Sequence, residues 1–197
     1  MRTAVPRWFS ISLWAIIIIF VMLVITSPHW LTLLYPLPHR ELVATSAEKY
    51  KVDPYLVFAI VRVESKFNRQ AKSVAGATGL MQIMPQTGEW IAGKMGIKSY
   101  NSQFLTQPNY NIPMGTWYLG NLNSEFDQRL PLVVASYNAG RGNVRQWVVG
   151  GIWDGTLENV NDIPYGETRQ YVVNVIKTYQ IYQAIYREGR LERAVAR

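Results

Sequence analysis

The feature that most constrains this fold is an apolar run that ends in a carboxylate. Asp53-Pro54 is typical of a helix N-cap followed by proline at the first helical position. Helical spacing after it places five side chains on one face: Val57, Ile60, Val61, Glu64 and Phe67. Because desolvation raises the pKa of a carboxyl group, a glutamate on such a face can donate a proton near neutral pH. The alternative is a glutamate that points to water from a helix end.

A loop with two glycines follows this helix, from Ala71 to Pro85. Gly76 and Gly79 let the backbone come close to a neighbouring segment or to a ligand. Gln82 adds an amide, and Met84 adds adaptable apolar surface. The loop therefore predicts a binding groove beside the carboxylate.

Four segments follow one another along the chain. They are Glu64-Ser65-x-Phe67, Gly79-Leu80-Met81-Gln82-Ile83-Met84-Pro85, Ser136-Tyr137-Asn138-Ala139-Gly140 and Ile163-Pro164-Tyr165-Gly166-Glu167-Thr168-Arg169-x-Tyr171-Val172. Together they resemble the motifs of the soluble-type lytic transglycosylases (SLT domain), members of the lysozyme superfamily that cut peptidoglycan. Ser136 departs from the common Ala-Tyr-Asn-Ala-Gly form, and its small size should make this departure minor. The resemblance covers roughly residues 40–186.

This resemblance implies a role for each matched residue. Glu64 is the expected catalytic acid and base. Ser73 is expected to hydrogen-bond it, and Tyr137 to point at its carboxyl group. The expected substrate-binding residues are Gln82, Met84, Asn138, Glu167 and Tyr171. Glu167 would be a second acid that shapes the site. No metal and no cofactor are expected.

The sequence favours a mainly α-helical fold, a lysozyme-like two-lobe domain with at most a small β element near Val74–Thr78. Apolar periodicity predicts further helices at these positions: 40–51, 86–94, 113–125, 130–137, 141–149 and from Glu167 onward. Tyr171, Tyr179, Tyr182 and Tyr186 recur at helical spacing in the last one and are expected in the core or the groove wall. The segment Asn111-Ile112-x-x-Gly115-x-x-Tyr118-Leu119 is similar to a family segment, and its expected role is helix packing through the small Gly115.

Composition excludes several kinds of site. The chain has 197 residues, enough for one good core, and no cysteine, which excludes disulfides, thiolate zinc sites and a cysteine nucleophile. The only histidines, His29 and His39, lie beside the first apolar segment, so a Ser-His-Asp triad or a histidine metal centre is excluded from the globular part. A formal charge of +7 suits an anionic partner. No basic run with interleaved aromatics is present, so nucleic acid is not expected.

Residues 8–27 are almost wholly apolar and are about as long as a bilayer-spanning helix. We predict a single-pass anchor in a bacterial cell membrane. Arg2 and Arg7 place residues 1–7 in the cytoplasm by the positive-inside rule. A cleaved signal peptide is the alternative, but the run lacks an Ala-x-Ala-like end. The predicted order continues with a linker at 28–39, an extracytoplasmic catalytic domain at 40–187 and a charged tail at 188–197.

The expected reaction follows from a single carboxylate in the first motif. Ordinary glycosidases use two carboxylates, whereas the acid next along the chain from Glu64 is Glu89. A lone carboxyl suffices if the substrate supplies the nucleophile. The prediction is non-hydrolytic cleavage of glycan strands between N-acetylmuramic acid and N-acetylglucosamine, with 1,6-anhydro products. The alternatives are a hydrolytic muramidase on the same scaffold and a non-catalytic wall-binding assembly protein. The sequence identifies no protein partner.

Overall fold

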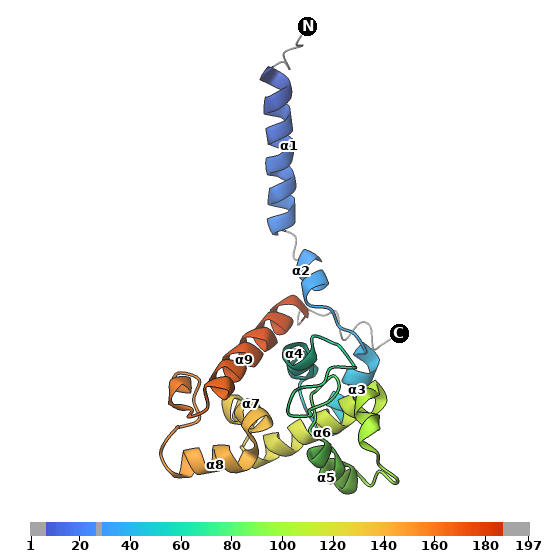
Figure 1. Cartoon of the computed structure of the whole chain (residues 1–197). Coiled ribbons are helices and arrows are strands. Elements are labelled where there is room, and N and C mark those ends of the chain that lie inside the picture. The colour runs from blue at the N-terminus through green and yellow to red at the C-terminus, as the bar shows by residue number, and fades with distance from the viewer. Residues whose placement is uncertain (1–6, 27–28, 187–197) are drawn as a thin grey trace. The chain divides into compact units, whose positions relative to one another are not determined.

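The structure, a computed structural model, describes residues 7–26 and 29–186. Most of the predicted segment 1–7, positions 27 and 28, and the predicted tail 188–197 lie outside the described residues. The elements in chain order are α1 (Arg7–Thr26), α2 (His29–Leu34), α3 (Arg40–Tyr50), α4 (Pro54–Ser65), α5 (Pro85–Met95), η1 (Ser102–Thr106), α6 (Pro108–Glu125), α7 (Leu130–Ala139), α8 (Arg141–Val149), η2 (Val160–Asp162) and α9 (Gly166–Tyr186) (Figure 1). The chain divides into two compact units, one ending at Pro36 and one beginning at Leu37.

The first unit contains α1 and α2. The helix α2 lies in the segment predicted as a linker, where Leu31, Leu33 and Leu34 precede the helix-breaking Pro36. Within the described ranges, no helix has both the length and the apolarity to cross a membrane. The predicted span at 8–27 therefore has no support from the structure and stays a prediction.

The second unit is built around α4, which is buried along most of its length. Asp53 caps it as predicted: its Oδ1 accepts a hydrogen bond of 2.8 Å from the Tyr55 amide, and Pro54 occupies the first turn. Four consecutive residues are fully shielded from solvent: Val57, Phe58, Ala59 and Ile60. The helix ends at Ser65, and Phe67 follows with a φ of 65°. Phe67 therefore lies beyond the helical face predicted for it.

The long helix α9 packs against both α4 and α7 (Figure 1). The buried rings of Tyr182 and Tyr186 lie 5.8 Å from Phe58 and 6.3 Å from Tyr55, respectively, between centroids. These contacts confirm the expected core position of both tyrosines. The Tyr179 hydroxyl donates to Asp53 Oδ2 at 2.8 Å, so α9 also holds the N-terminal end of α4.

The loop after α4 contains the small β element expected near Val74–Thr78. It consists of two isolated antiparallel bridges, Lys72 to Thr78 and Thr78 to Ile83, and the described residues form no sheet. The mainly helical prediction is thus confirmed. The division of the second unit into two lobes stays a prediction.

Asn111 fixes this loop from α6. Its Oδ1 accepts a hydrogen bond of 2.7 Å from the Met81 amide, and its Nδ2 donates to the carbonyl oxygens of Thr78 and Leu105 at 3.0 and 2.9 Å. The Asn111 side chain has no exposed surface, and its bonds to Met81 and Leu105 are buried. One side chain therefore joins the loop, η1 and α6.

The start of α6 was predicted wrongly. The helix begins at Pro108 and carries Pro113 inside it, whereas the sequence placed its start at Pro113. Proline usually disfavours a helix interior, but here Asn111 anchors the turn before Pro113 to the loop and η1. The packing role of Gly115 is confirmed, since a Cβ there would lie 2.4 Å from Met81 Sδ.

Gly79→Ala should destabilise the fold strongly, by about 3 kcal/mol or more, because it combines left-handed strain with a steric clash. Gly79 has a φ of +83°, and a Cβ there would lie 1.9 Å from the Leu105 carbonyl oxygen and 2.5 Å from Asn111 Nδ2. Urea unfolding of the full chain measures the loss.

Gly76→Ala is the matched control. Gly76 has a φ of +95° in the same loop, but a Cβ there would meet nothing within 4 Å. It should cost only the conformational strain of about 1–2 kcal/mol. Equal losses in the two variants would contradict the proposed clash.

Candidate active site

Glu64 lies at the C-terminal end of α4, where the helix leaves the core. Its side chain is half-buried, and its Oε1 accepts a hydrogen bond of 2.6 Å from the Tyr171 hydroxyl. Tyr171 is a buried residue of α9. The packing of α9 on α4 therefore positions the carboxylate directly.

The surroundings of Glu64 raise its pKa from 4.5 to about 7. Burial is the largest cause, because it disfavours the charged form. The hydrogen bond from Tyr171 acts in the opposite direction, and the negative charge of Glu167 raises the pKa further. A pKa near neutrality suits a group that gives up a proton and takes one back.

Tyr137 lies in the electric field of Glu64. Burial, followed by the negative charge of Glu64, raises the pKa of the Tyr137 phenol well above its usual value. Its hydroxyl donates to the Met81 carbonyl oxygen at 2.8 Å. The direct hydrogen bond to the carboxylate comes from Tyr171, which the sequence assigned only to substrate binding.

Ser73 and Gln82 both hold the loop together. Ser73 Oγ accepts a hydrogen bond of 3.0 Å from the Ala77 amide, and no hydrogen bond among the described residues joins Ser73 to Glu64. Gln82 adopts a φ of 45°, and its Nε2 donates to the carbonyl oxygens of Ala71 and Gly79 at 3.0 and 2.8 Å. These two side chains shape the loop that faces the site.

The remaining predicted residues are Met84, Asn138 and Glu167. Met84 is 38% exposed and immediately precedes α5. Asn138, on α7, accepts a hydrogen bond of 2.7 Å at its Oδ1 from the Thr168 hydroxyl. Glu167 is exposed in the first turn of α9. Of these residues, Glu167 is the one whose charge acts on Glu64.

The described residues contain no group of three or more His, Cys, Asp or Glu side chains arranged to hold a metal ion.

Residues 41–151, more than half of the chain, match the family described as Transglycosylase SLT domain. The chain belongs to this family. It is 37% identical to the soluble lytic murein transglycosylase of Escherichia coli (strain K12), over 157 residues that make up 78% of this chain and 23% of that protein. It is 29% identical to the membrane-bound lytic murein transglycosylase C of Glaesserella parasuis serovar 5, over 75% of this chain and 46% of that protein.

Solved structures show the same fold. The lytic transglycosylase Slt of Pseudomonas aeruginosa, solved as an inactive mutant, superposes with a TM-score of 0.71 and 38% identity, covering 78% of this chain and 25% of that one. The 70-kDa soluble lytic transglycosylase of Escherichia coli gives a TM-score of 0.72 and 34% identity, covering 76% and 25%. This chain thus spans about a quarter of the length of the two solved proteins and of the Escherichia coli relative.

The sequence motifs contain two residues, Thr168 and Asn111, whose organising roles in this SLT domain were not predicted. Thr168 is 2% exposed and joins the third motif to the fourth through Asn138. Asn111 joins the second motif to α6. The available signal was a polar residue on an otherwise apolar helical face: Asn111 lies one turn before Gly115, on the side that meets Met81.

Tyr171→Phe should raise the pKa of Glu64 above its value of about 7, because the variant loses the hydrogen bond that favours the carboxylate. A carbon NMR titration of the Glu64 carboxyl group measures the change. Tyr179→Phe is the matched control, since it removes a hydrogen bond to Asp53 at the other end of α4 and should leave the Glu64 pKa unchanged.

Glu167→Gln tests the same electrostatic balance with the opposite sign. Removing its negative charge should lower the pKa of Glu64, since that charge now disfavours a second one nearby. A shift in the same direction in Tyr171→Phe and Glu167→Gln would contradict this description of the site.

Proposed function

We propose that this chain is a peptidoglycan lytic transglycosylase. It cleaves the β-1,4 bond between N-acetylmuramic acid and N-acetylglucosamine without water and leaves 1,6-anhydro ends. The observation that carries the proposal is the Glu64 carboxyl group, whose pKa of about 7 suits a group that acts first as acid and then as base. Relatives named lytic murein transglycosylases support it.

In this proposal Glu64 transfers two protons. Its protonated form donates to the glycosidic oxygen as the bond to the muramoyl C1 breaks. The 2-acetamido oxygen of the substrate stabilises the positive charge that develops at C1. The ionised Glu64 then accepts the proton of the muramoyl C6 hydroxyl while the C6 oxygen bonds to C1. The enzyme is returned to its protonated form, and no cofactor takes part.

The neighbours of Glu64 have supporting roles in the proposal. Tyr171 holds the carboxyl group in position through its hydrogen bond. Tyr137 supports the carbonyl of Met81, and Ser73 shapes the loop. Substrate contacts are assigned to Gln82, Met84, Asn138, Glu167 and Tyr171. Met84, at the end of the loop before α5, offers an exposed apolar side chain for such a contact.

A hydrolytic muramidase on the same scaffold is the second candidate. One observation favours it: Glu167 is exposed and its charge reaches Glu64, so it could orient a water for attack at C1. Glu89, the acid next along the chain from Glu64, has its effect on Tyr100 instead. The two candidates differ in their products.

Digestion of purified peptidoglycan should release products that end in 1,6-anhydro-N-acetylmuramic acid. Such ends weigh one water less than hydrolytic ends and cannot be reduced by borohydride, because the C6 oxygen occupies C1. Mass spectrometry before and after borohydride treatment distinguishes them. Mostly reducing muramoyl ends would reassign the chain as a hydrolase, with Glu167 as the residue that orients water.

Glu64→Gln is the matched variant for this experiment. The amide keeps the side-chain volume but has no proton to transfer, so cleavage should fall at least about a hundredfold while the domain stays folded. Circular dichroism checks the fold. Undiminished cleavage in a folded variant would show that Glu64 is not the catalytic acid and base. A wild-type chain that binds the wall without cleaving it would be a wall-binding protein.

We further propose that residues 8–27 anchor the chain in a bacterial cell membrane as a single pass, with the catalytic domain on the extracytoplasmic side. Support comes from the sequence: an apolar run about 20 residues long, preceded by Arg2 and Arg7. A relative named membrane-bound is consistent with the same location.

The full-length protein should stay in the membrane fraction through high-salt and carbonate washes, because burial of apolar side chains in lipid is insensitive to both. N-terminal sequencing of the mature protein should recover residues from the first helix. A soluble chain that begins near His29 would show that the segment is a cleaved signal peptide.

A further inference from the structure

A pocket of about 270 Å³ has a lining that does not include Glu64. Its lining comes from three helices: Gln86, Thr87 and Trp90 of α5, Tyr118 of α6 and Arg141 of α8. The lining contains aromatic rings, an amide, a hydroxyl and one guanidinium group. Such a mixture suits a small polar ligand with a negative charge.

Two contacts hold the guanidinium group of Arg141 in place. It lies over the ring of Trp90, 4.9 Å from the ring centroid, and its Nη1 pairs with Glu125 Oε2 at 3.3 Å. The Trp90 ring is itself fixed edge-on against Trp117 and Tyr118, at 5.5 and 6.0 Å. Arg141 therefore loses little conformational entropy when it binds a ligand.

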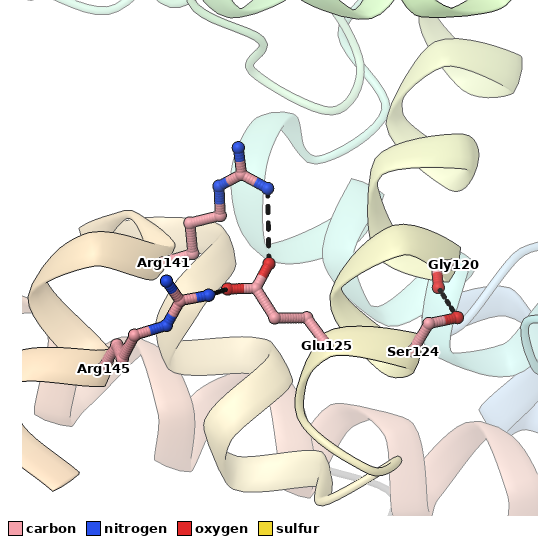
Figure 2. Close-up of polar contacts among 5 residues, drawn as sticks. All are labelled: Gly120, Ser124, Glu125, Arg141 and Arg145. Atoms are coloured by element: carbon pink, nitrogen blue, oxygen red, sulfur yellow. Dashed lines mark hydrogen bonds and ion pairs between the residues drawn. The ribbon is translucent and has the colours of Figure 1, made fainter. Parts of the chain in front are cut away.

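The charges around the pocket do not balance. Glu125 is the carboxylate partner of both Arg141 and Arg145, each through a different oxygen, and Figure 2 shows the two side chains of α8 converging on it. One negative charge thus faces two positive ones. In Figure 2 a terminal nitrogen of Arg141 points away from Glu125. A guanidinium group has five N–H donors, so Arg141 retains donors for a carboxylate ligand.

The pocket adjoins the candidate active site through Tyr118. The Tyr118 ring lies 5.6 Å from the ring of Tyr137, and the Tyr137 hydroxyl binds the Met81 carbonyl in the loop beside the site. The helix α5, which supplies most of the lining, begins directly after Met84. A polymer lying along this loop would thus reach both places.

We propose that this pocket binds a carboxylate carried by the glycan strand, away from the bond that is cut. Arg141 is the charged contact, and Gln86 and Thr87 supply hydrogen bonds. Two parts of the polymer offer a carboxylate: the stem peptide, and the lactyl group of a muramoyl residue that carries no peptide. The assignment rests on the proposed peptidoglycan substrate and adds a binding role for residues outside the four motifs.

The test compares binding of full-length protein in detergent to three soluble ligands by calorimetry. The ligands are peptide-bearing strands, amidase-treated strands that keep their lactyl carboxylates, and neutral chito-oligosaccharides. All variants carry Glu64→Gln, so that no strand is cut and binding is measured even if the chain has another activity. Arg141→Gln should weaken binding of carboxylate-bearing strands at least about tenfold and leave the Kd of chito-oligosaccharides unchanged.

Arg145→Gln is the matched control. It removes the other arginine that pairs with Glu125 but does not line the pocket, so it should leave all three Kd values within about twofold. A loss confined to peptide-bearing strands assigns the stem peptide as the ligand, and a loss for amidase-treated strands as well assigns the lactyl group. Equal losses for neutral and charged ligands, equal losses in both arginine variants, or no loss would overturn the proposal.

Without Glu64→Gln, the same protein reports on the proposed function separately. Strands that bind through Arg141 but are never cut would contradict the transglycosylase assignment and leave the carboxylate pocket standing. Strands that are cut with equal KM by wild type and Arg141→Gln would support the transglycosylase assignment and contradict the carboxylate pocket.

Discussion

Two hydrogen bonds between α9 and α4 position the catalytic candidate at one end of the core. Tyr171 donates to Glu64 near the C-terminus of α4, and Tyr179 donates to the Asp53 cap at its N-terminus. The two helices therefore run in opposite directions and are joined at both ends. Between these bonds, α4 contains four apolar residues that are fully shielded from solvent, Val57 to Ile60. A change in the packing of α9 would move the carboxyl group and the helix cap together.

The position of Glu64 lowers stability at neutral pH. Its pKa rises from 4.5 to about 7 on folding, so between these values the unfolded chain releases a proton that the folded chain keeps. The favourable contribution of the group is complete below pH 4.5 and is lost as the pH rises through 7, by at most about 3 kcal/mol. The buried face of α4 offsets this cost.

The sequence was sufficient for features that depend on local pattern. The cap at Asp53, the glycine packing at Gly115 and the core tyrosines of α9 follow from short-range spacing, and the structure confirms each of them. Contacts between distant segments could not be predicted from the sequence. The bond from Tyr171 to Glu64 joins residues 107 positions apart, and helical spacing says only which face Tyr171 occupies. The start of α6 was predicted wrongly for the same reason. Asn111 is held by the loop and by η1, and periodicity within one segment cannot show that these segments meet.

Two acids with unequal surroundings decide what this site can do. Glu167 is exposed at the start of α9, where a negative charge is favoured at a helix N-terminus. Glu64 is shielded, and the charge of Glu167 helps to keep it protonated. The burial of Glu64, rather than its residue type, thus gives this carboxyl group its raised pKa. A site of this kind needs only one proton-transfer group, provided that the nucleophile comes from the substrate. If water were the nucleophile, Glu167 would have to orient that water for attack at C1. Its negative charge would also disfavour the ionised form of Glu64, which the same step requires.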